Sequence, residues 1–160
     1  VFNLPMSAFQ SGEEIQPPFI AKQHKFTPAI CYEIIFGAQV QKNLHAETDF
    51  LLTLSNDAWF GNSIGPWQHL QMARMRALEL GKPEIRATNT GITAFIDAKG
   101  QVIAQAPQFV ETTLTQRIAP TVGKTPYAQL GDMPLYLLCF LLVILRGVNL
   151  LLWRMMKKRA

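Results

Sequence analysis

Cysteine and histidine are scarce in this chain: its 160 residues include two cysteines and three histidines. A disulfide-stapled domain needs more cysteines, and Cys31 and Cys139 are not expected to pair because Cys139 lies inside a long apolar run. His24, His45 and His69 have no metal-ligand spacing with one another or with the cysteines. We therefore predict no metal site and no cofactor, and we expect each histidine to be a surface or capping residue.

Charge is also sparse, because only 16% of the residues are charged and the net charge is +4. The basic residues are scattered except for a cluster of Lys157, Lys158 and Arg159 near the carboxyl end. Without a basic strip interleaved with exposed aromatic residues, we expect no nucleic-acid partner. The length suits one domain with an appendage. Because the chain starts at Val1 rather than at methionine, we expect a piece of a longer or processed protein.

Long hydrophobic runs are absent except for one, at residues 134–153. A bilayer core needs about 20 mostly apolar residues, so we predict a transmembrane helix there. Arg146 opposes insertion by about 2.5–3.5 kcal/mol, which the surrounding leucines, isoleucine and valine offset. Residues 154–160 form a basic tail, so the positive-inside rule predicts a cytoplasmic carboxyl terminus, with the rest of the chain across the membrane. The alternative is a buried amphipathic helix of a soluble domain, which needs a wider polar face.

The first 25 residues are predicted to be an irregular arm. Ser11-Gly12 and Pro17-Pro18 interrupt any helical or strand periodicity there. The arm is nevertheless rich in apolar side chains, which either pack against the body or form a mobile lid that touches lipid. These side chains are Phe2, Leu4, Met6, Phe9 and Phe19.

The body of the chain alternates predicted strands and helices, which indicates an α/β fold. Strands are predicted over residues 27–32 and 50–55, with a short helix over residues 34–43 between them. A helix-length connection makes the two strands parallel neighbours with a right-handed crossover. The second strand is apolar almost throughout, as in strands covered on both faces. A helix over residues 66–80 follows, and then strands over residues 85–90, 92–97, 101–105 and 112–118.

Cys31 lies at the end of the first predicted strand, followed by Tyr32 and Glu33. The carboxyl ends of strands in open α/β sheets are where ligands bind. Two interpretations remain open for Cys31. A free cysteine is often a buried small hydrophobe. It also serves as a nucleophile where a base removes its proton and donors hold the developing oxyanion.

A second polar stretch follows the second predicted strand and would arrive beside Cys31. In it, Asn56 can donate or accept in a site, Asp57 can orient a neighbour or cap a turn, and Trp59 can form a wall. The alternative is an ordinary loop held by its Asn and Asp side chains, with its aromatic residues folded into the core.

Three motifs together resemble a known family. They are Cys-Tyr-Glu at residues 31–33, Ser-Asn-Asp-Ala-Trp-Phe at residues 55–60, and Arg-Ala-Thr-Asn-Thr-Gly at residues 86–91, followed by the apolar segment. This combination resembles the carbon-nitrogen hydrolase (nitrilase) superfamily, and within it the membrane-anchored bacterial enzymes that acylate lipoproteins. The resemblance implies an α-β-β-α sandwich, with residues 1–130 as the carboxyl-terminal part of the hydrolase domain. It also implies an inner-membrane protein whose catalytic domain is periplasmic.

The resemblance also implies roles for four residues. Cys31 matches the family's nucleophile and Glu33 an auxiliary glutamate, while the backbone amide of Tyr32 would join the oxyanion hole. Trp59 matches an active-site aromatic of the family, and we also expect Asn56, from its place after the second predicted strand, on the oxyanion and substrate-binding side of the site. The family completes its triad with a glutamate base and a lysine, which we expect in a segment that precedes Val1. We therefore expect these 160 residues alone to be inactive.

The activity implied is acyl transfer. Cys31 would take a fatty acyl chain from a membrane phospholipid as a thioester and pass it to the α-amine of the diacylglyceryl cysteine of an apolipoprotein. One alternative is a membrane-tethered amidase that uses the same cysteine with water as acceptor. Another is a noncatalytic envelope binding or scaffold module in which Cys31 is merely packed.

Overall fold

The computed structural model describes residues 12–159. The predictions for Phe2, Leu4, Met6 and Phe9 lie outside this part of the chain. Within the predicted arm, residues 19–21 form a strand, so the prediction of an irregular segment as far as residue 25 is wrong. This strand forms because the chain turns back after Ala21 and pairs in antiparallel register with the next strand.

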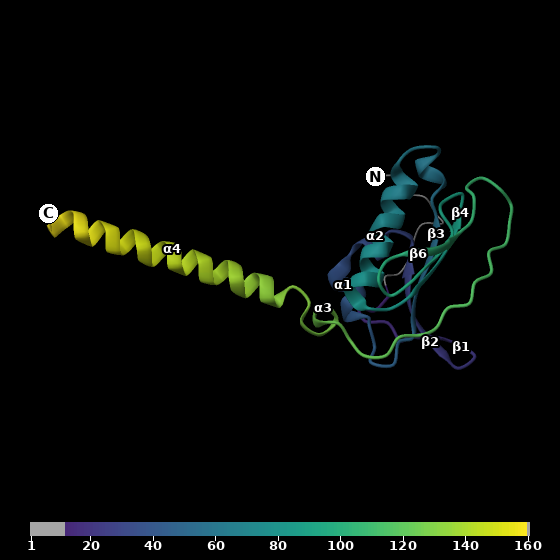
Figure 1. Cartoon of the computed structure of the whole chain (residues 1–160), viewed down its shortest axis with the longest axis horizontal. Coiled ribbons are helices and arrows are strands. Elements are labelled where there is room, and N and C mark those ends of the chain that lie inside the picture. The colour runs from purple at the N-terminus through teal and green to yellow at the C-terminus, as the bar shows by residue number, and fades with distance from the viewer. Residues whose placement is uncertain (1–11, 160) are drawn as a thin grey trace.

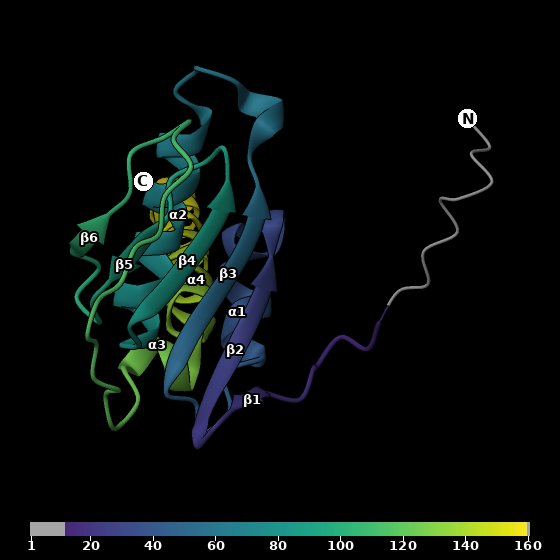
Figure 2. The ribbon, with the colours of Figure 1, turned by 90° about the vertical axis from the view of Figure 1, so that its right-hand side faces the viewer.

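Six strands form a single mixed sheet in the order β1-β2-β3-β4-β5-β6 (Figure 2). The three central strands β2, β3 and β4 are parallel, as predicted for the first two of them, and the outer pairs are antiparallel. The strands are β1 (Phe19–Ala21), β2 (His24–Ile30), β3 (Phe50–Asn56), β4 (Glu84–Asn89), β5 (Ala94–Ile96) and β6 (Val102–Gln105).

Helices cover one face of this sheet (Figure 1). The long helix α2 has the predicted buried stripe of Leu70, Ala73, Ala77 and Leu80, and it ends at Gly81, whose φ of +65° suits glycine. The helical segments are η1 (Cys31–Ile35) and η2 (Ala58–Phe60), both 3₁₀ turns, and α1 (Gly37–Lys42), α2 (Gly65–Leu80), α3 (Pro126–Leu130) and α4 (Met133–Arg159).

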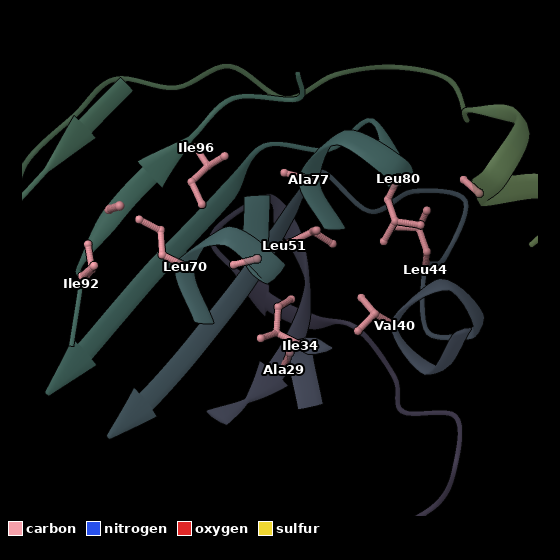
Figure 3. Close-up of a cluster of buried hydrophobic side chains, with 13 residues drawn as sticks. Ala29, Ile34, Val40, Leu44, Leu51, Leu70, Ala77, Leu80, Ile92 and Ile96 are labelled. Carbon is pink, nitrogen blue, oxygen red and sulfur yellow. The ribbon is translucent and has the colours of Figure 1, made fainter. Parts of the chain in front are cut away.

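The hydrophobic core fills the space between these helices and the sheet (Figure 3). Val40 of α1 and Ala77 of α2 pack there with Leu51 of β3 and Ile96 of β5, all of them buried. On the opposite face of the sheet, Ile30 is 54% exposed and apolar side chains remain uncovered. The described residues therefore supply one helix layer and one sheet, which is half of an α-β-β-α sandwich.

The strand predicted over residues 27–32 begins and ends earlier than predicted. It runs from His24 to Ile30, because its first residues pair with β1 and its later ones with β3. It stops where the Ile30 N–H donates to the Glu33 carboxylate at 2.7 Å, which closes the chain into the turn η1. Cys31 and Tyr32 thus lie on that turn rather than on the strand.

The prediction of a strand over residues 112–118 is wrong. This stretch has no regular structure, because it pairs with no other strand of the sheet. The extended segment is tied to the body further on, at Thr121. The Thr121 hydroxyl donates to the Gly81 carbonyl, and the Thr121 carbonyl accepts from the ammonium of Lys82.

Helix α4 is long and apolar enough to cross a membrane. The candidate span is Met133–Lys157, with a mean hydropathy of 2.4, and it includes the predicted segment 134–153. None of its most apolar stretch is buried against the rest of the chain, and Figure 1 shows the helix projecting from the body. Residues 12–159 do not bury this helix, so they give no support to the alternative of a helix buried in a soluble domain.

Candidate active site

The carboxyl ends of β2, β3 and β4 meet at one edge of the sheet. Because the strands are parallel and in register, Ile30 pairs with Leu54, and Asn56 pairs with Asn89. The turns that leave these three ends therefore share a single edge. Cys31 is the first residue beyond β2.

Cys31 has an unusual backbone. Its φ is +52°, a left-handed conformation that costs a residue with a Cβ about 1–3 kcal/mol and that is enriched at functional sites. Its side chain is half-buried, which fits either interpretation of Cys31, a packed thiol or a nucleophile. The Glu33 carboxylate caps the turn that carries Cys31, and the Tyr32 side chain is exposed.

Asn56 and Trp59 lie beyond the end of the neighbouring strand β3. The Asn56 side-chain oxygen accepts from the Ala58 N–H at 3.1 Å, which shapes the start of η2. Trp59 is 90% exposed, so the alternative in which both aromatic residues fold into the core is wrong for it. Phe60 does turn inward, with its ring 6.4 Å from that of His69.

A buried ionic cluster lies beneath these turns. Asp57, His69 and Arg86 are each at most 2% exposed. Asp57 Oδ2 accepts from Arg86 Nη2 at 2.9 Å, and Asp57 Oδ1 accepts from the Ser55 hydroxyl at 2.6 Å. His69 Nδ1 lies 3.0 Å from both Asp57 Oδ1 and Arg86 Nη2. The cluster joins the middle of β4 and the turn after β3 to helix α2.

His69 also contacts Cys31 directly, because His69 Nε2 lies 3.1 Å from the Cys31 carbonyl oxygen. A carbonyl oxygen can only accept, so Nε2 carries a hydrogen. Burial lowers the pKa of His69, and the charge of Arg86 lowers it further, whereas Asp57 and the bond to Cys31 oppose this. The neutral ring then accepts at Nδ1 from Arg86.

The structure overturns the prediction that His69 is a surface or capping residue, and it finds functional candidates that the sequence did not single out. His69 lies four residues before Ala73 and so shares its buried stripe, which is a signal the sequence contained. Arg86 lies on the face of β4 that meets the helices. No pattern in the sequence indicates that face, because Ile85 and Ala87, its neighbours, are the apolar residues.

Two hollows border the site. A groove of about 730 Å³ runs between residues 12–19 and β2, and it reaches Ile30 and Glu33. A smaller hollow of about 40 Å³ lies between Tyr32 and His69. Among residues 12–159, no group of three or more His, Cys, Asp or Glu side chains is arranged to hold a metal ion.

Glu84 is a second buried acid on β4. It is fully buried, and its Oε1 accepts from the Thr53 hydroxyl at 2.8 Å. Burial raises its pKa to about 7, while the hydrogen bond from Thr53 and the charges of Arg86 and Arg76 oppose the rise. The carboxyl is therefore protonated over much of the acidic range.

We expect Glu84 to make the folded protein less stable as the pH rises through about 7, and Glu84→Gln to remove this effect. The pKa of Glu84 is about 7 in the folded protein against 4.5 for a free side chain. The contribution of the protonated Glu84 carboxyl to the free energy of unfolding is therefore fully present below pH 4.5 and lost above pH 7. A shift of this size corresponds to up to about 3 kcal/mol. Thermal unfolding of both forms in detergent from about pH 5 to about pH 8 measures it.

Comparing the two forms isolates Glu84, because the titrations of His69 and every other group are common to both. Glu47→Gln is the matched control, since Glu47 is 53% exposed on its side chain and pairs with Lys25 at the surface. Parallel pH profiles for wild type and Glu84→Gln would contradict this prediction.

Comparison with known proteins gives the family. A model of the carbon-nitrogen hydrolase family matches residues 3–127. The chain is 70% identical, over 98% of its length, to the apolipoprotein N-acyltransferase of Haemophilus influenzae, and 64% identical, over 96%, to that of Pasteurella multocida. It spans 30% of the length of each of these relatives.

Solved structures support the same fold at lower identity. An amidase from Nesterenkonia sp. superposes with a TM-score of 0.53 at 18% identity, covering 81% of this chain and 49% of the amidase. A carbon-nitrogen hydrolase from Helicobacter pylori superposes with a TM-score of 0.53 at 14% identity, covering 62% and 42% of the two chains. With the family model matching most of the chain, these 160 residues belong to the carbon-nitrogen hydrolase family.

Proposed function

We propose that this chain carries the cysteine nucleophile of an apolipoprotein N-acyltransferase. The observation that carries the proposal is Cys31 itself, half-buried on a left-handed turn at the shared edge of three parallel strands. The 70% identity to an enzyme of that name supports it. The chain spans 30% of that relative, so we propose that the base and the lysine that the family resemblance implies belong to the part of the encoded protein outside these 160 residues.

In the first step, the Cys31 thiolate attacks the carbonyl carbon of a phospholipid ester. A carbon–sulfur bond forms, the ester carbon–oxygen bond breaks, and the leaving lysophospholipid oxygen takes a proton. The acyl chain is then held on Cys31 as a thioester. In this proposal the Tyr32 backbone amide donates to the developing oxyanion, since Tyr32 directly follows Cys31 on η1.

In the second step, the free α-amine of a diacylglyceryl apolipoprotein attacks the thioester. A carbon–nitrogen bond forms, the carbon–sulfur bond breaks, the amine loses a proton, and the Cys31 thiol is regenerated. Glu33 supports both steps by capping the turn of Cys31, and its side chain is exposed. Asn56 offers its side-chain amide from the neighbouring strand end.

A general base and a lysine complete the site from the segment that precedes Val1. Lys25 and Glu14 do not take these roles, because Lys25 pairs with Glu47 and Glu14 pairs with Lys42 at the surface. A cysteine without a base reacts slowly as a neutral thiol. The isolated 160-residue piece should therefore give no turnover.

Helix α4 anchors this site at the bacterial inner membrane. The basic residues at its end, which include Lys157, are retained on the cytoplasmic side by the positive-inside rule, so the sheet and Cys31 lie in the periplasm. Both substrates are lipids. A membrane-tethered site reaches them without extracting them into water.

The proposal is tested by the product. The polypeptide as encoded, with any segment that precedes Val1, is given phospholipid with a tagged acyl chain and a diacylglyceryl peptide with a free amino terminus. An amide-linked tag on the peptide supports acyl transfer, and the same peptide with an acetylated amino terminus is the control. Release of the tag only as free fatty acid, whether or not the peptide is present, would instead make the protein a hydrolase.

We also propose that Trp59 lines the path of the acyl chain, because an indole ring left 90% exposed beside the site offers apolar surface to a lipid. Trp59→Ala is expected to slow acyl loading of Cys31 by about tenfold, mainly through a higher KM for the phospholipid. The rate of thioester formation against phospholipid concentration measures this.

Trp67→Ala is the matched control, because Trp67 is an exposed indole on the first turn of α2. Its loading rate should remain near that of the wild type. Unchanged loading in Trp59→Ala would remove Trp59 from the acyl path.

A further inference from the structure

The proposed nucleophile depends on a backbone conformation that a cysteine does not adopt readily. Cys31 has a positive φ, and such a conformation persists only when the surrounding structure holds it in place. One support is local, since Glu33 caps the turn through the Ile30 N–H at 2.7 Å. A second support comes from a distant part of the chain, 38 residues further on, where His69 approaches the Cys31 carbonyl.

The approach of His69 is fixed by packing. The side chain is 2% exposed, on the face of α2 that meets the sheet. Its ring is flanked by that of Tyr32 at 5.8 Å and that of Phe60 at 6.4 Å. These neighbours leave the imidazole little freedom to rotate, so Nε2 remains directed at the Cys31 carbonyl at 3.1 Å.

The other side of the ring is fixed by charge. Asp57 and Arg86 lie 3.0 Å from Nδ1, and they pair with each other at 2.9 Å. Arg86 Nε also donates to the Ile92 carbonyl at 3.2 Å. Gly91 makes room for this arrangement, because a Cβ added there would collide with the Asp57 carboxylate. The cluster is therefore held from β3, from β4 and from the turn after β4.

The contact with Cys31 does not depend on the charge of the ring. A neutral ring with its hydrogen on Nε2 accepts at Nδ1 from Arg86, and a protonated ring donates at Nδ1 to Asp57. In both states, Nε2 donates to the Cys31 carbonyl. The ring does not reach the reacting sulfur through either of these bonds, which distinguishes it from a general base.

We propose that His69 is a positioning residue for Cys31: held by Asp57 and Arg86, it donates to the Cys31 carbonyl and fixes the turn that presents the thiol. This inference rests on the proposed role of Cys31 as nucleophile. Because the thiol and the Tyr32 amide both belong to this turn, loosening it moves the nucleophile and an oxyanion donor together. Displacements of about 1 Å at a reacting group cost on the order of 100-fold in rate.

Two variants of similar size separate the hydrogen bond from the packing. Glutamine carries an N–H donor about where Nε2 lies, and methionine has a similar length and shape without a donor.

The experiment uses the encoded protein, with any segment that precedes Val1, and phospholipid with a labelled acyl chain. It measures the single-turnover rate of Cys31 acylation against pH, the KM for the phospholipid, and the unfolding temperature. His45→Met is the control, because the His45 ring lies at hydrogen-bond distance from the Gln16 carbonyl, away from Cys31.

We expect His69→Met to acylate Cys31 on the order of 100-fold more slowly at unchanged KM, and His69→Gln to remain within about tenfold of the wild type. His69→Gln should also keep the shape of the wild-type pH profile, because no proton passes through the ring. Acylation of His69→Met at the wild-type rate, or equal impairment of the two folded variants, would overturn the positioning role. Loss of one limb of the pH profile in His69→Gln would overturn it in favour of proton transfer.

If His69→Met does not fold, His69→Gln decides: a rate within about tenfold of the wild type supports the proposal, and a larger loss in a folded protein overturns it. The behaviour of the wild type tests the proposed function separately from the positioning role. A wild type that never carries the acyl chain on Cys31 contradicts the acyltransferase assignment. A wild type that loads normally, beside an unimpaired His69→Met, contradicts the positioning role alone.

Discussion

Cys31→Ala is expected to abolish acyl transfer by the encoded protein, with a loss of at least about 10³-fold, because alanine has no sulfur on which the acyl-enzyme thioester could form. The fold should survive, since the Cys31 side chain is only half-buried and alanine adds no bulk. Transfer of a labelled acyl chain to a diacylglyceryl peptide measures the loss, and the unfolding temperature reports the fold.

Cys139→Ala provides the matched control for Cys31. Cys139 is the only other cysteine of the 160 residues, and it is exposed on α4. It should retain wild-type transfer. If Cys31→Ala transfers acyl chains as fast as Cys139→Ala, Cys31 is not the nucleophile and the account fails.

Arg86→Met is expected to have the largest effect on stability. Arg86 is 1% exposed, and its guanidinium compensates the buried carboxylate of Asp57 at 2.9 Å. Removing one partner of a buried ion pair typically costs about 3–5 kcal/mol, because the other charge is left uncompensated. For a domain of this size that corresponds to a fall in Tm on the order of 10 °C, measured by thermal unfolding in detergent.

Two further variants test whether the loss of stability in Arg86→Met comes from the uncompensated carboxylate of Asp57. Arg117→Met changes an exposed arginine on the segment after β6 and should leave the Tm unchanged. Arg86→Met combined with Asp57→Asn removes the uncompensated carboxylate and should recover part of the lost stability. A double variant that melts no higher than Arg86→Met would show that the loss does not come from the buried charge.

Much of the fold could be predicted from the sequence, because it depends on local patterns. The apolar run at residues 50–55 had to be a buried strand, and the connection from residue 34 to residue 43 required a crossover to a parallel neighbour. The buried stripe of α2 and the hairpin after residue 97 follow the periods of 3.6 and 2. The strand predicted over residues 112–118 failed, because an alternating pattern forms a strand only where another strand is available to pair with it.

The site could be predicted only in part, for a physical reason. Motifs identify Cys31, Tyr32 and Glu33 because these residues are contiguous. The burial of His69 and Arg86 depends on which face of a helix and of a strand meets the core. On β4 the charged side faces the core. The buried charge of Arg86 is compensated by the carboxylate of Asp57, which follows the neighbouring strand β3. Such compensation is visible only once the strands are placed together.

The measurement that tests the central claim most directly is a mass-spectrometric search for the acyl chain on Cys31. The encoded protein in membranes is loaded with phospholipid carrying a tagged acyl chain, and the peptide that contains Cys31 is weighed before and after hydroxylamine. The account predicts the tag on Cys31 through a hydroxylamine-labile bond, and its loss when a diacylglyceryl peptide amine is added. An unlabelled Cys31 in a folded protein that transfers acyl chains would contradict it.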